Sequence, residues 1–229
     1  ELFSIGTLAF MLVFHLILFF FLSKKYHKEP LYLVLLCTAI IIRALIINVG
    51  SQYWFVLFPS SSFEFLIYLE FQFAYAIPLL IVQFINALFP DILSKKALKI
   101  INILGYTLIF SALLPTSTYL YSLPFLNLFS LLAFLIELYC SIIAIRKGFK
   151  EAYVVLGAFC VSFTFTLLEI AHHSGWFHVV YANLSAIGMM LFLFLQSFVI
   201  SYRISKAFEK SAYLSQNLEK EVEKRIQEL

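Results

Sequence analysis

Residues 24–49 read KKYHKEPLYLVLLCTAIIIRALIINV, a basic turn followed by a long apolar run. The apolar part, 31–49, is close to the roughly 20 residues that a helix needs to cross a bilayer. Basic turns of the same kind recur at 95–99 and 146–150, and each is followed by another apolar run. This stretch therefore predicts a chain that crosses a membrane repeatedly.

The distribution of Lys and Arg predicts the orientation of the chain. Three loops that alternate with the basic turns contain no Lys or Arg: 50–62, 115–124 and 172–180. The chain from Arg203 onward is basic again, and Arg43 is the one basic residue inside an apolar segment. Because basic loops stay cytoplasmic during insertion, we expect the N-terminus outside, seven crossings and a cytoplasmic C-terminus.

The predicted fold class is all-α, a polytopic membrane protein with a seven-transmembrane-helix bundle. Of all residues, 62% are hydrophobic and 13% are charged, which lies outside the range of soluble domains. The runs do not alternate as the strands of a membrane barrel do. Pro124 is expected at the end of a segment and Pro78 inside one. The expected helices cover about 5–22, 31–49, 63–89, 98–114, 125–145, 152–171 and 181–202.

The segment 204–229 differs from the receptor domain expected over 1–203, because it is rich in Lys, Glu, Gln and Ser. A narrow apolar stripe runs along it: Leu214, Leu218, Val222, Ile226 and Leu229. Charges of both signs flank this stripe, which favours a parallel dimeric coiled coil continuing the seventh helix. The alternative is an amphipathic helix lying on the membrane. The stripe is still in phase at Leu229, so we expect an output domain to follow.

Polar residues inside the apolar segments share helix faces. One stripe of 63–89 contains Tyr68 and Gln72, and we expect it to face the bundle interior. Its members are interpreted either as hydrogen-bonding groups between helices or as part of a ligand-sensing surface. Cys37, Cys140 and Cys160 lie in apolar segments without metal-binding spacing, and they are expected to be small buried residues.

Ionisable residues in these segments need a specific reason to be there. Arg43 and Glu70 lie at similar depths on neighbouring antiparallel segments, so we predict an intramembrane ion pair between them. Glu137 lies near mid-membrane with no partner expected at its depth. We expect a buried carboxyl that is protonated, because burial disfavours the charged form.

A cluster of Glu and His ends the sixth segment: Glu169, His172, His173, Trp176 and His178. Three interpretations stay open. His and Trp are typical of a membrane interface. His titrates near physiological pH, which suits ligand or proton sensing. Glu169 and His173 are four apart on one helical face, so they are also candidate metal ligands.

Several classes of chemistry lack their motifs. The segment 181–202 has no Lys for a retinal Schiff base, and no Walker loop or GxSxG elbow is present. The net charge of +3 is explained by loops facing anionic lipid, so no nucleic-acid partner is predicted. We predict no cofactor.

The chain resembles the bacterial seven-transmembrane receptors with diverse intracellular signalling modules (7TMR-DISM). The stretches KKYHKEPLYLVLL, FINALFPDILSKKALKII and QSFVISYRISKAFEKSAYLSQNLEKEVEKRIQEL carry the resemblance. The exit segment is its most specific part, with matches at Ser197, Ser201, Arg203, Ser205, Ala207, Leu218, Glu219, Val222, Arg225, Glu228 and Leu229. The family typically has an extracellular β-sandwich sensor before the bundle and a kinase, nucleotide cyclase or phosphatase after the coiled coil.

The resemblance implies a signal-transducing receptor module in the inner membrane of a bacterial cell, without catalysis of its own. The expected partners are membrane lipids, a second copy through the coiled coil, and an unknown ligand or an N-terminal extracytoplasmic sensor domain. The alternative from another class is a membrane-embedded metal-dependent hydrolase that uses Glu169, His172, His173 and His178.

Overall fold

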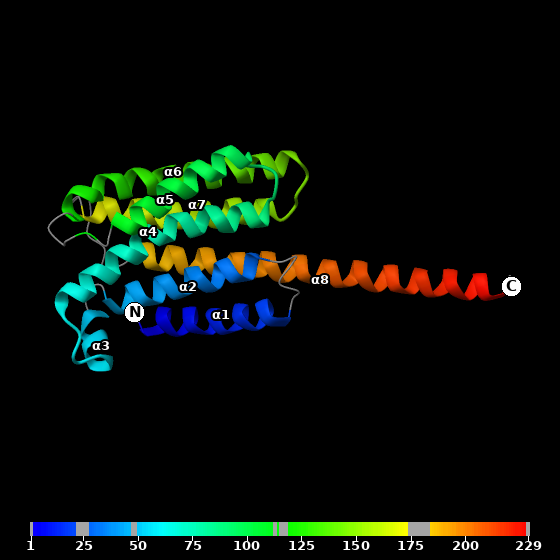
Figure 1. Ribbon diagram of the computed structural model, residues 1–229, viewed down its shortest axis with the longest axis horizontal. Helices are drawn as coiled ribbons and strands as arrows, with labels where there is room; N and C mark the ends of the chain where they lie inside the picture. Colours follow the sequence, from blue (N-terminus) through cyan, green and yellow to red (C-terminus); the bar gives the residue numbers. More distant parts are fainter. Residues whose placement is uncertain are drawn as a thin grey trace.

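Eight helices form the described part of the chain, which comprises residues 2–21, 28–46, 50–111, 114, 119–173 and 184–227 of the computed structural model (Figure 1). No strand occurs in these residues. The helices are α1 (Leu2–Phe21), α2 (Glu29–Ile46), α3 (Gly50–Leu57), α4 (Phe63–Leu88), α5 (Lys95–Ser111), α6 (Tyr119–Arg146), α7 (Ala152–His173) and α8 (Leu184–Gln227). The all-helical architecture that the sequence predicts is therefore present.

Six of the helices pack as a closed ring in the order α1, α2, α4, α6, α7 and α8, with α8 returning to α1. The main apolar core fills this ring and includes Leu33, Phe84, Val155 and Leu193. Helix α5 packs outside the ring on α4 and α6, and the short α3 packs against α2. The second half of α8 projects alone beyond the bundle (Figure 1). We call the end of the bundle that α8 leaves the exit end.

The turns at the exit end have well-defined local signals. Gly148 ends α6 with a φ of 86°, a left-handed conformation that glycine adopts without strain. The Gly148 amide donates to the Ile145 carbonyl and the Phe149 amide to the Ala144 carbonyl, which together form a Schellman motif. Ser94 caps α5, since its hydroxyl accepts from the Ala97 amide at 3.2 Å. These turns fix the ends of α6 and α5.

Two glycines permit close helix packing. A Cβ on Gly188 of α8 would lie 2.6 Å from Cβ of Phe165 on α7, so only glycine fits there without a shift. A Cβ on Gly105 of α5 would lie 2.8 Å from a methyl group of Leu79 on α4. The first contact makes α7 and α8 a tightly packed pair.

The outer surface of the bundle is apolar. Large side chains such as Phe10 at 73%, Phe110 at 65% and Phe125 at 62% are exposed. Five helices are long and apolar enough to cross a membrane: α1, α2, α4, α6 and α8. Among the described residues, α5 has 17 residues and the apolar part of α7 runs from Ala152 to Leu168. Both are shorter than the 18 residues required of a candidate span. Such a surface suits a hydrocarbon environment.

Several details differ from the sequence expectations. Helix α3 lies in a loop for which no helix was expected. Helix α6 begins at Tyr119, so Pro124 lies inside it and not at its start. Cys160 is exposed, whereas Cys37 and Cys140 are buried as expected. Helical spacing places Cys160 on the outward face of α7, which composition could not reveal.

Candidate functional site

Arg203 of α8 connects three other helices at the exit end. Its Nη1 donates to the carbonyl oxygen of Leu88 at 2.6 Å. The same atom lies 3.5 Å from Oε1 of Glu29, and Nε lies 3.3 Å from Oε1 of Glu151. The three charged side chains are mostly buried, with exposed fractions of 25%, 12% and 14% for Arg203, Glu29 and Glu151. Arg203 is therefore the centre of a four-helix contact, which we call the Arg203 junction.

Helix geometry explains why these groups meet. Glu29 is the first residue of α2 and Glu151 directly precedes α7, so both carboxylates lie at positive helix N-termini. Leu88 is the last residue of α4, and its carbonyl has no partner within the helix. A guanidinium reaches that carbonyl and both carboxylates at once because it is a planar fork of donors. The charges at the junction therefore complement the helix dipoles: carboxylates lie at the N-termini of α2 and α7, and the guanidinium lies at the C-terminus of α4.

The Arg203 junction is also the boundary between two environments of α8. The next residue, Ile204, is buried, and every described residue from Ser205 to Gln227 is exposed. Four tail side chains form the apolar stripe, with exposed fractions of 52% for Leu214, 63% for Leu218, 53% for Val222 and 67% for Ile226. Leu229 lies outside the described residues. Nothing in the described part of the chain covers this stripe.

A second polar contact ties α8 to α1 within the bundle. Nε2 of His15 lies 2.8 Å from the hydroxyl of Ser197, which also donates to the Leu193 carbonyl at 2.9 Å. His15 and Gln196, the residue before Ser197 in α8, are fully buried. Sequence reasoning did not consider His15, although a titratable residue in an apolar helix was the signal that could have found it.

The middle of the ring contains further buried polar groups. Glu137 is 2% exposed, and it lines a narrow crevice with Ser162, Phe134 and Phe192. Ser141, one turn further along α6, is fully buried. These side chains bring α6, α7 and α8 together around a carboxyl group inside the bundle.

Other predicted site residues have structural contacts. Nε2 of Gln72 lies 3.2 Å from the Tyr68 hydroxyl and donates to the Ile109 carbonyl of α5 at 3.1 Å. The bond to Ile109 fits the interhelical interpretation, whereas the bond to Tyr68 lies within α4. Ligand sensing by Tyr68 and Gln72 stays a prediction. Arg43 and Glu70 lie on α2 and α4, which pack together. The predicted ion pair between Arg43 and Glu70 stays a prediction.

The predicted Glu and His cluster is only partly described. Helix α7 includes Glu169, His172 and His173, but Trp176 and His178 lie outside the described residues. The side chains of Glu169 and His173 are also outside them. Within the described residues no three His, Cys, Asp or Glu side chains gather as metal ligands. Metal binding and sensing at this cluster stay predictions.

Comparison with known proteins now identifies the family. The family model for the 7TM diverse intracellular signalling domain matches residues 1–203, and its last residue is the arginine of the junction. No curated protein and no solved structure matches the chain. The chain is a multi-pass membrane protein, and it belongs to the 7TM diverse intracellular signalling family.

Proposed function

We propose that this chain is a receptor module that relays an extracytoplasmic stimulus to a cytoplasmic output domain of the kinase, nucleotide cyclase or phosphatase type. The observation that carries the proposal is α8, a single helix from Leu184 to Gln227 that is packed in the bundle and then fully exposed. A continuous helix transmits displacement and rotation along its axis. The chain itself would catalyse nothing and would act in the inner membrane of a bacterium.

Seven crossings with the exit end inside the cell fit this role. Helix α7 packs in the ring between α6 and α8, and α5 packs on the long spans α4 and α6. At about 25 Å, 17 residues of α5 nearly match a hydrocarbon core of about 30 Å. Lys95, Lys96, Arg146 and Lys147 all lie at the ends of helices that meet at the exit end, which supports its cytoplasmic location.

The Arg203 junction supplies a mechanism for the relay. A change in packing on the far side of the bundle that moves the ends of α2, α4 or α7 would shift the partners of Arg203. Because these partners lie on three helices, their relative displacement would bias the position of α8. Two arrangements of the junction would thus correspond to two positions of the exposed tail.

We propose a second copy of the chain as the partner of the apolar stripe in the tail. All four described stripe residues are more than half exposed, and the stripe is too narrow to bury a broad face. Arg225 and Glu221 form a surface ion pair at 3.5 Å beside it, as is common at the flanks of a coiled coil. A parallel dimer would bring two output domains together.

An insertion series tests the relay. Residues 1–229 are placed before a reporter enzyme that is active as a coiled-coil dimer, and residues are inserted between Ser211 and Ala212. We expect output to change with two inserted residues and to return with seven, because a seven-residue insertion restores the phase of a coiled coil. The matched control is the same series without residues 1–203. Output that ignores the length of the insert would refute a relay through α8.

A further inference from the structure

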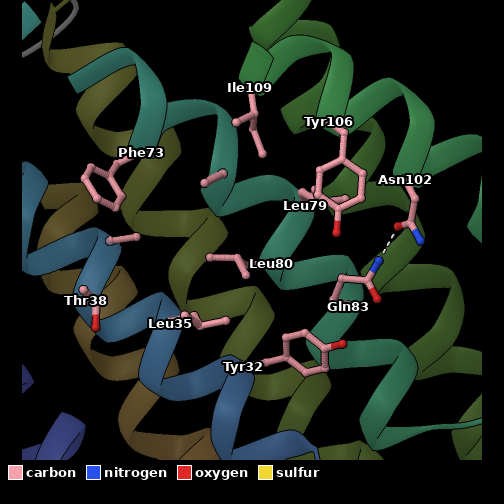
Figure 2. Close-up of a pocket in the computed structure, with 12 residues that line it drawn as sticks. Tyr32, Leu35, Thr38, Phe73, Leu79, Leu80, Gln83, Asn102, Tyr106 and Ile109 are labelled. Atoms are coloured by element: carbon pink, nitrogen blue, oxygen red, sulfur yellow. Dashed lines mark hydrogen bonds between the residues drawn. The ribbon is translucent and has the colours of Figure 1, made fainter. Parts of the chain in front are cut away.

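A cavity of about 390 Å³ lies between α2, α4 and α5 (Figure 2). It exists because α2 and α5 both pack on α4 while their described backbones stay apart from each other. Leu35 at 41% exposed and Tyr106 at 52% stand at its rim. Ligand sites in proteins typically enclose about 300–1,000 Å³. The cavity is therefore large enough to receive a small ligand from the side of the bundle.

Polar groups gather at one side of the cavity. Nε2 of Gln83 donates to Oδ1 of Asn102, and the hydroxyl groups of Tyr32 and Tyr106 point toward this pair (Figure 2). The bond uses one N–H of Gln83 and the Asn102 carbonyl, so the Gln83 carbonyl and the Asn102 amide remain as acceptor and donor. Neither tyrosine hydroxyl bonds to another described side chain. Donors and acceptors thus converge without a charge among the residues that line the cavity.

The rest of the lining is apolar except for Thr38, whose hydroxyl donates to the Val34 carbonyl of its own helix. Leu35, Phe73 and Leu80 lie on the side opposite the polar groups (Figure 2), and Ala39 and Ala76 also line the cavity. A site with one uncharged polar side and one apolar side matches an amphiphilic molecule that has an uncharged polar head and an apolar tail. A charged headgroup would find no ion-pair partner among these side chains, and burying an unpaired charge is costly.

We infer that this cavity binds a single-chain amphiphile with an uncharged, hydrogen-bonding head, taken up from the bilayer. The head, a hydroxyl, ester or amide, bonds to Tyr32, Gln83, Asn102 and Tyr106. The acyl chain lies along Phe73 and Leu80. Binding at this site goes beyond the proposed relay and does not depend on it.

The site is close to the Arg203 junction along the same helices. Tyr32 follows Glu29 by three residues, so both lie on one side of α2. Gln83 precedes Leu88 by about 7.5 Å along α4 at 1.5 Å per residue. An occupant would thus touch two of the helices whose ends hold Arg203.

Photolabelling tests the inference directly. Residues 1–229 are placed in phosphatidylcholine nanodiscs with a monoacylglycerol that has a diazirine in its acyl chain, and labelled peptides are identified by mass spectrometry. We expect label on the segments that contain Leu35, Phe73 and Leu80. Tyr106→Phe should lower this labelling about fivefold, the factor that corresponds to one neutral hydrogen bond.

Matched controls distinguish specific binding of the polar head from non-specific binding to an apolar surface. Tyr139→Phe is the control for Tyr106→Phe, because Tyr139 is 53% exposed and lies outside the cavity on α6. Ala76→Trp should abolish labelling by filling the space, with thermal unfolding used to verify the fold. Equal labelling by a lysophosphatidylcholine with the same diazirine chain, or an unchanged Tyr106→Phe variant, would overturn the inference.

Discussion

The two halves of α8 have similar lengths but opposite environments. From Leu184 to Ile204 the helix packs against α7, α1 and α2, and its polar residues Gln196 and Ser197 face the bundle. From Ser205 to Gln227 every described side chain is exposed, and apolar residues face outward. One continuous helix thus joins a half that packs against neighbouring helices to a half that projects alone beyond the bundle (Figure 1). The Arg203 junction is the place where a change in the first half can reach the second.

The largest effect is expected from overpacking the bundle half. Gly188→Leu would drive a side chain into Phe165, because even a Cβ at position 188 would lie 2.6 Å from Cβ of Phe165. We expect a loss of about 3 kcal/mol in the free energy of unfolding, the upper end for overpacked sites. Gly157→Leu is the control, because nothing lies within 4 Å of the place that its Cβ would take. Steric-trapping unfolding in bicelles measures both, and an equal effect of the two variants would contradict the tight α7–α8 contact.

Removing the guanidinium at the boundary should rank next. Arg203→Ala removes the ion pairs with Glu29 and Glu151 and the hydrogen bond to the Leu88 carbonyl. We expect a loss of about 1.5–3 kcal/mol in the free energy of unfolding, the range for bonds to charged groups. Arg203→Lys should recover only part of it, because an ammonium group cannot reproduce the fork. Steric-trapping unfolding in bicelles measures the free energy of unfolding of both variants. An unchanged value for Arg203→Ala would show that the Arg203 junction does not stabilise the bundle.

A smaller effect is expected from the contact between α8 and α1. Ser197→Ala removes the partner of His15 at 2.8 Å. We expect a loss of about 0.6 kcal/mol, the average for interhelical hydrogen bonds in membrane proteins. Thr164→Ala is the control, because that exposed hydroxyl bonds only to the Cys160 carbonyl of its own helix. If Thr164→Ala cost as much as Ser197→Ala, the contact would have no special role.

The smallest effect is expected in the exposed half. Arg225→Ala breaks a pair with Glu221 in which both side chains are more than 60% exposed. We expect at most about 0.5 kcal/mol on the unfolding of the bundle. The unfolding curve should therefore overlay that of the unmodified chain. A shift as large as that of Arg203→Ala would mean that the tail contacts the bundle.

The lengths of the apolar runs predicted the long helices, because an apolar run is a local property of the sequence. The sequence also predicted that Glu137 is a buried carboxyl, and its side chain is 2% exposed. The Arg203 junction was not predictable, since Glu29 and Arg203 are 174 residues apart and a 3.6-residue period defines a face but not its neighbour. The resemblance had marked Arg203 only as a motif position. The cavity was missed for the same reason, because it depends on the separation of α2 from α5.

Disulfide crosslinking of the tail in native membranes tests the central claim most directly. In a chain with Cys37, Cys140 and Cys160 replaced by Ala, single cysteines are introduced as Leu218→Cys on the stripe and Lys220→Cys on the opposite side. We predict an efficient dimer crosslink at 218, little at 220, and a changed ratio between the two when Arg203→Gln is added. Equal crosslinking at both positions, or a ratio that Arg203→Gln leaves unchanged, would contradict a tail whose position is controlled by the bundle.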